Sequence, residues 1–133
     1  MRTGAARKRA LVQVALRVEA ALTSHVNTNG PPGVDPSHVG AVLKYARTRP
    51  SREDLQRYLD ALPRSALARY TASAGPQLER TCKEAARALQ DVSRTMAGDP
   101  EARVVEAFAY VVGLVAHGLT TRERGRASRP ARE

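Results

Sequence analysis

The residues best suited to bind another molecule lie between Lys44 and Tyr58, in the sequence KYARTRPSREDLQRY. This stretch has a tyrosine near each end, a proline in the middle and two acidic residues after the proline; its five basic residues are Lys44, Arg47, Arg49, Arg52 and Arg57. With Arg64 and Arg69, residues 44–69 hold seven basic and three acidic side chains, a net charge of +4. Basic side chains around a turn can reach successive phosphates of a nucleic-acid backbone, so we expect phosphate binding here. The alternative is a solvated surface of two helices, with pairs such as Asp54 with Arg57.

The remaining positive charge lies mainly at the two ends of the chain. The net charge is +9, of which residues 1–9 contribute +4 and residues 119–133 contribute +3. Such a distribution favours an anionic partner, most often nucleic acid, and the alternative is that the charge serves solubility. We therefore add Arg7, Lys8 and Arg9 to the predicted phosphate contacts.

A second basic stripe is expected on a helix over residues 76–97. Its members are Arg80, Lys83, Arg87 and Arg94, placed roughly opposite an apolar face. Acidic residues accompany them, with Glu79 four residues before Lys83 and Asp91 four residues after Arg87. We therefore expect this stripe to be a solvated face, and the alternative is that it forms a second nucleic-acid contact.

No arrangement of residues in the sequence predicts catalysis. The three histidines, His25, His38 and His117, stand at no recognisable metal-ligand spacing from another His, Cys, Asp or Glu. Cys82, the single cysteine, fits a small buried hydrophobic residue and an intracellular, reducing compartment. We therefore expect a cytoplasmic, noncatalytic protein with no metal or cofactor. The longest apolar run, residues 107–116, is too short to span a membrane, so no membrane partner is expected.

Helical periodicity runs through nearly the whole chain and predicts an all-α bundle of five or six helices. The expected helices cover residues 6–26, 36–47, 51–62, a short segment from Pro63 to Gly75, 76–97 and 100–117. Prolines and glycines separate them, and Asp35, Ser51 and Asp99 are expected N-caps. Residues 10–118 form one domain, and residues 1–9 and 119–133 are expected to be disordered basic arms.

Two apolar stripes should form much of the core. Residues Leu55, Tyr58, Leu59 and Leu62 follow the spacing of a buried helix face. The helix over 100–117 is apolar on most sides and should be central, with Val105, Phe108, Val112 and Val115 in the core.

The segment around Pro50 also matches a helix-turn-helix, the arrangement of many DNA-binding regulators. In that interpretation the helix after Ser51 would enter the DNA groove. Its first turn carries Glu53 and Asp54, however, and two carboxylates beside DNA phosphates are repulsive. Contact with the backbone through the turn itself avoids this conflict. A DNA-binding regulator is the second hypothesis, and a protein-interaction module is the third.

The helix order, the basic turn KYARTRPSRED and the closing helix EARVVEAFAYVVGLVAHG resemble the small helical subunits of class 1 CRISPR effector complexes. The resemblance covers most of residues 10–118; the Arg-rich tail and the proline-rich loop at 27–36 depart from it. It implies a noncatalytic subunit of an antiviral ribonucleoprotein filament, present in several copies beside other subunits. Such a subunit would contact guide RNA, or the target or displaced strand, with Arg47, Arg49, Arg52 and Arg57 in the groove.

Overall fold

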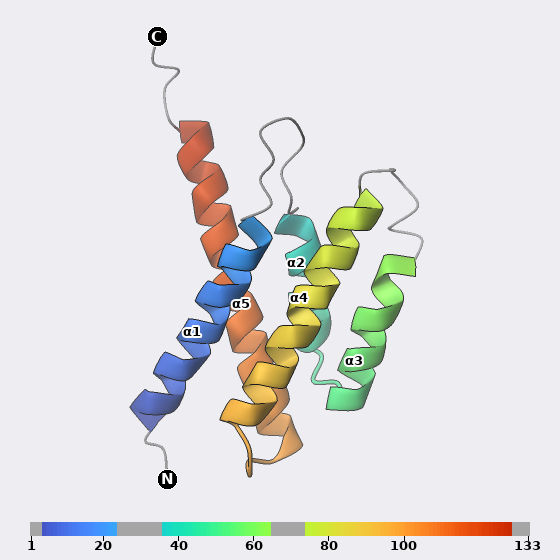
Figure 1. Cartoon of the computed structure of the whole chain (residues 1–133), viewed down its shortest axis with the longest axis vertical. Helices are drawn as coiled ribbons and strands as arrows, with labels where there is room; N and C mark the ends of the chain where they lie inside the picture. Colours follow the sequence, from blue (N-terminus) through green and yellow to red (C-terminus); the bar gives the residue numbers. More distant parts are fainter. Residues whose placement is uncertain (1–3, 24–35, 65–73, 129–133) are drawn as a thin grey trace.

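The computed structural model describes residues 4–23, 36–64 and 74–128. These residues form five α-helices and one 3-10 helix: α1 (Gly4–Thr23), α2 (Pro36–Ala46), α3 (Arg52–Ala61), η1 (Leu62–Arg64), α4 (Ala74–Thr95) and α5 (Glu101–Ser128) (Figure 1). The described part of the chain contains no strand. The predicted all-α bundle is therefore confirmed.

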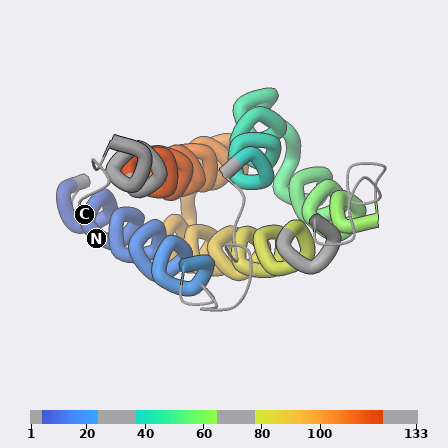
Figure 2. The backbone as a smooth tube through the Cα atoms, turned by 90° about the horizontal axis from the view of Figure 1, so that it is seen from above, coloured from blue at the N-terminus to red at the C-terminus, as the bar shows by residue number. Residues whose placement is uncertain are grey.

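The helices pack in two layers (Figure 2). Helices α1 and α4 lie side by side in one layer, and α2 and α5 lie side by side in the other. Helix α3 contacts α4 at the edge of the bundle. Helices α4 and α5 each contact every other α-helix, so α5 is central, as the sequence predicted, and shares that place with α4.

The core consists mainly of small and branched aliphatic side chains around one aromatic ring. Phe108 and Val111 of α5 are fully buried, as are Leu55 of α3, Leu78 and Val92 of α4. All four predicted core residues of α5 are buried, which confirms the second apolar stripe. The first stripe is confirmed at its three leucines, whereas its tyrosine is only half-buried.

Helix α5 contains a segment, Glu101–Thr121, that is long and apolar enough to cross a membrane by length and composition alone. The core helix of a globular bundle can have the same length and composition, and 44% of an 18-residue stretch within this segment is buried in the fold. Its buried side chains pack against α1, α2 and α4. The apolar character of α5 is thus used in helix–helix packing.

The basic N-terminal segment differs from its prediction. Helix α1 begins at Gly4, two residues before the expected start, so residues 4–9 are helical and not a disordered arm. The physical reason is an ion pair across the bundle. One guanidinium nitrogen of Arg7, Nη1, lies 2.9 Å from Oδ2 of Asp99 and 3.1 Å from its Oδ1. Asp99 was predicted to cap the last helix, but that helix begins at Glu101 and the Asp99 side chain binds Arg7.

The C-terminal tail also differs. Helix α5 runs to Ser128, so disorder is the wrong prediction for residues 119–128. These residues lack an apolar period, which is why the sequence pattern ended the helix near His117. However, the segment contains no proline, and a helix that has already formed extends cooperatively through residues such as Leu, Arg and Glu.

Part of the predicted fourth helix, with Leu67 and Tyr70, lies outside the described residues, as does the loop at 27–35. Of that predicted helix, the structure describes Pro63 and Arg64, within η1, and Ala74 and Gly75, within α4. Gly75 was expected to end that helix, but it lies in the first turn of α4. Gly98 is the expected C-terminal glycine: its φ is 93°, a left-handed conformation that glycine adopts without a steric penalty.

Candidate nucleic-acid interface

The turn between α2 and α3 is held by hydrogen bonds at both helix ends. The last turn of α2 closes with bonds from the amides of Arg47 and Thr48 to the carbonyls of Leu43 and Tyr45, and the Thr48 hydroxyl donates to the Tyr45 carbonyl at 2.6 Å. Ser51 caps α3 as predicted, since its Oγ accepts from the Asp54 amide at 3.0 Å. The turn therefore holds its side chains in a defined geometry.

Arg49 occupies the most strained position of this turn. Its φ is 61°, the only positive value among the described residues other than glycine. Glycine is the usual residue at such a helix end, because a Cβ in the left-handed region crowds the following carbonyl oxygen. Arg49 therefore carries a charged side chain at a position where the backbone conformation favours glycine.

The two tyrosines of the basic stretch stack on each other. The ring centroids of Tyr45 and Tyr58 are 4.1 Å apart and the rings are nearly parallel, with 5° between their planes. The Tyr58 hydroxyl donates to the Ala41 carbonyl at 3.4 Å, and burial raises the pKa of Tyr58 above 10.0. These rings join α2 to α3, and each covers one face of the other, so less ring surface is left on which bases could stack.

Four basic side chains of the stretch are exposed and have no acidic side chain within ion-pair distance in the described part of the chain: Lys44, Arg47, Arg49 and Arg52. We call these four residues the turn cluster. Arg57 differs, because its guanidinium pairs with Glu53 at 2.6 Å and with Asp54 at 3.7 Å. The pair of Asp54 with Arg57, which the alternative of a solvated surface anticipated, is thus present. Arg64 is exposed in η1, and Arg69 lies outside the described residues.

Carboxylates of α5 stand close to the turn cluster. Glu101 Oε1 accepts a hydrogen bond from the Arg52 amide at 3.3 Å, which links the start of α5 to the start of α3. An open cleft of about 520 Å³ lies between the turn and α5, and its charged lining residues are Arg47, Arg49, Glu101 and Glu106. The cleft is thus lined by positive side chains from the turn and negative side chains from α5. An anion bound there would contact the arginines on the side of the turn.

The N-terminal basic residues fall into two groups. Arg7 is occupied by Asp99 in the free protein, and its side chain is 32% exposed. Lys8 and Arg9 are exposed on α1 and have no acidic partner within ion-pair distance in the described ranges. Of the three predicted contacts in this segment, only Lys8 and Arg9 are available to a ligand without breaking an ion pair.

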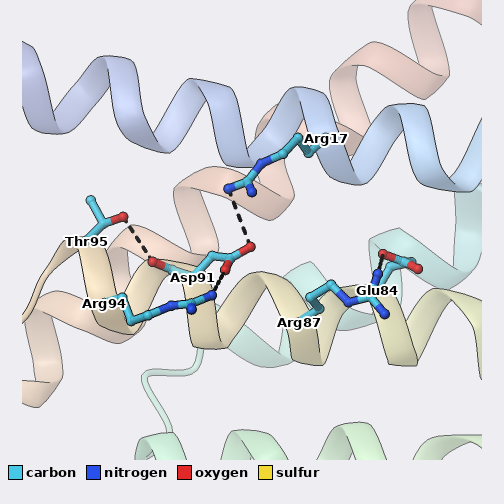
Figure 3. Close-up of polar contacts among 6 residues, drawn as sticks. All are labelled: Arg17, Glu84, Arg87, Asp91, Arg94 and Thr95. Atoms are coloured by element: carbon cyan, nitrogen blue, oxygen red, sulfur yellow. Dashed lines mark hydrogen bonds and ion pairs between the residues drawn. The ribbon is translucent and has the colours of Figure 1, made fainter.

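The basic stripe on α4 is largely a solvated face with its own pairs (Figure 3). Neither expected i, i+4 pair forms: Arg87 pairs with Glu84 at 3.6 Å, and no ion pair joins Glu79 to Lys83. Asp91 instead pairs with Arg94 one turn away and, at 3.5 Å, with Arg17 of α1 (Figure 3). The sequence pattern missed this last pair because its residues are far apart in the chain.

The single cysteine and two of the three histidines, His38 and His117, lie among the described residues. Cys82 is buried as predicted, and burial raises the pKa of its thiol to about 11. His38 is buried, His117 is exposed, and no group of three or more His, Cys, Asp and Glu in the described ranges could hold a metal ion. Comparison with protein-family models, curated proteins and solved structures found no match to this chain.

Proposed function

We propose that this protein is a noncatalytic subunit that binds the phosphate backbone of RNA or single-stranded DNA through the turn cluster. The observation that carries the proposal is the set of four exposed cations around one short turn, none of them with an acidic partner in the described structure. Because arginine presents a planar fork of donors, three arginines in this position suit phosphate oxygens. Arg57 and Arg7 contribute less, since each already binds a carboxylate.

Binding through the backbone, without sequence readout, follows from two neighbours of the turn cluster. The Tyr45 and Tyr58 rings cover one face of each other, which leaves less ring surface for base stacking. Glu53 and Asp54, at the start of α3, have side chains that are 73% and 55% exposed and would repel phosphates in a DNA groove. Phosphate contacts carry no base information, so affinity should vary little with sequence.

One feature favours the DNA-binding regulator as the second candidate. Helices α2 and α3 are joined by residues 47–51 alone, a connection of the length found in helix-turn-helix domains. The exposed carboxylates of Glu53 and Asp54 stand against it, for the reason given above. We therefore place the regulator second.

The proposed setting is a cytoplasmic ribonucleoprotein assembly in which several copies lie along a guide RNA beside other subunits. This part of the proposal rests on the resemblance to small helical subunits of class 1 CRISPR effector complexes. A single cluster makes few contacts, so stable binding would require several copies or the remaining subunits.

The proposal is tested with two triple variants that remove the same charge. R47A/R49A/R52A removes the arginines of the turn cluster, and R80A/K83A/R87A removes three basic residues of α4 as a control. Binding to random single-stranded RNA is measured over a salt series, with circular dichroism to check the fold. If three phosphates are lost, the log–log salt slope should fall by about two, at ~0.7 per phosphate, in the first variant only. An unchanged slope in R47A/R49A/R52A would remove the turn cluster from the function.

The two candidates are separated by selection from a random duplex pool. A regulator should enrich one duplex by about 10³-fold or more over others, commonly with two half-sites about one helical turn apart. A backbone-binding subunit should enrich no sequence and should purify with bound RNA. Enrichment of a palindromic site would favour the regulator over the proposed function.

A further inference from the structure

We propose that the bound strand crosses one end of the bundle, from the turn cluster to a second group of phosphate contacts formed by Lys8, Arg9 and Arg103. We call these three residues the end cluster. This inference rests on the proposed function and extends its site. It assigns a contact to Arg103, which the sequence pattern did not single out, and it assigns none to the outer face of α4.

The connection between α4 and α5 brings the two clusters together. Within residues 99–101, Asp99 binds Arg7 of α1 and Glu101 binds the backbone amide of Arg52 in α3. The starts of α1, α3 and α5 therefore lie at the same end of the bundle, the lower end in Figure 1. Arg103 lies in the first turn of α5, two residues after Glu101, and its side chain is exposed.

Several carboxylates at this end are engaged by the protein itself, whereas Glu106, which lines the cleft beside Arg47 and Arg49, has no hydrogen-bond or ion-pair partner among the described residues. Asp99 binds Arg7, Glu101 accepts from the α3 backbone, and Glu53 and Asp54 both bind Arg57. By contrast, the three side chains of the end cluster have no acidic partner within ion-pair distance among the described residues. The positive charge of these three side chains is therefore available to phosphates.

The outer face of α4 offers a weaker alternative. Its residues Glu79, Arg80, Lys83, Glu84 and Arg87 carry three basic and two acidic groups, a net charge of +1. Arg87 is paired with Glu84, and Arg80 has a partner within the protein. A phosphate there would meet carboxylates on the same face, so the end of the bundle is the better path for a strand.

The arrangement also sets a minimum length for the nucleic acid. Helix α5 contacts both α1 and α3, which do not contact each other, so the α1 members of the end cluster, Lys8 and Arg9, lie about two helix spacings from α3. Packed helices lie 8–10 Å apart, which gives a span of roughly 16–20 Å. A stacked strand advances about 3.4 Å per phosphate, so about six nucleotides are needed to reach both clusters.

The test combines strand length with matched variants. Fluorescently labelled oligouridylates of about 4 and about 12 nucleotides are bound to the wild type, to K8A/R9A/R103A and to the control R80A/K83A/R87A, which loses the same charge. The end-cluster variant should bind the long strand about 10- to 100-fold more weakly near 0.1 M salt, because three contacts at ~0.7 each lower the salt slope by about two. Its affinity for the short strand should change by less than about 3-fold, and the control should change little for either strand.

Three results would overturn the inference. Equal losses of affinity for the long strand in K8A/R9A/R103A and in R80A/K83A/R87A would mean that binding follows net charge alone. Undiminished binding of the long strand by K8A/R9A/R103A, together with a loss in R47A/R49A/R52A, would refute the end cluster while the proposed function stands. A wild-type protein that binds neither strand would refute the proposed function, and the inference with it.

Discussion

Arg49 allows backbone strain and nucleic-acid binding to be separated by two substitutions at one position. Arg49→Ala removes the guanidinium but keeps a Cβ at a φ of 61°. Arg49→Gly removes the guanidinium and also the Cβ. The two variants therefore lose the same charge and differ only in the cost of the left-handed conformation.

The expected difference in stability follows from that conformation. A left-handed residue with a Cβ costs about 1–2 kcal/mol, whereas glycine costs about 0.5–1 kcal/mol through the greater freedom of the unfolded chain. Arg49→Gly should therefore be more stable than Arg49→Ala by roughly 1 kcal/mol, as expected where φ is positive. For a chain of 133 residues this corresponds to a melting temperature about 3–5 °C higher.

The expected effect on binding is different, because both variants lose one phosphate contact. The log–log salt slope should fall by ~0.7 in each, with closely similar affinities. Thermal unfolding measures the first effect, and fluorescence anisotropy with single-stranded RNA measures the second. Equal melting temperatures would show that the turn is not strained at Arg49, and wild-type affinity in both variants would show that this arginine does not contact phosphate.

Three further predictions concern the fold. Phe108→Ala should lower the free energy of unfolding by roughly 3–5 kcal/mol in urea denaturation. The control Leu16→Ala, at a side chain that is 54% exposed, should change it by less than about 0.5 kcal/mol. A small loss for Phe108→Ala would contradict the central place of this ring. Burial raises the pKa of Cys82 from 9.0 to about 11, so the unfolded chain loses the thiol proton at a lower pH than the folded chain does. The contribution of this thiol to the free energy of unfolding is therefore fully present below pH 9 and falls by on the order of 2 kcal/mol as the pH rises toward 11. Cys82→Ala should lack this part of the alkaline loss, and equal pH profiles would refute the assignment. Asp91→Asn, which weakens the links to Arg17 and Arg94, should cost at most about 1 kcal/mol and cost less at high salt; a loss that is independent of salt would argue against an ionic role.

The sequence predicted the helices well where local signals were strong. Proline at 36, the Ser51 cap and Gly98 each act within one helical turn, so their effects can be recognised without the fold. The ends of the chain were predicted less well. The apolar period used to place helices is absent from residues 119–128, yet a helix continues there because extension needs no buried face.

For the candidate site, exposure was predictable and pairing was not. The apolar stripes of α2 and α3 indicate which side faces the core, so the basic residues between the stripes had to point outward. The partners of Asp99 and Asp91 depend on how α1 lies against the rest of the bundle, and Arg7 and Asp99 are separated by 92 residues. Arg103 was overlooked because a single basic residue in an apolar segment forms no cluster until the helix starts are placed together.

The helical N-terminus changes how the end cluster would act. A disordered arm carrying Lys8 and Arg9 would have to become ordered on binding, at about 1–2 kcal/mol for each backbone residue that is fixed. In the structure α1 already holds both residues, and the ion pair of Arg7 with Asp99 fixes that helix against the start of α5. Only side-chain freedom would then be lost when phosphates bind, so fewer contacts suffice for a given affinity. The ion pair that takes Arg7 out of the proposed contacts therefore preorganises its two basic neighbours.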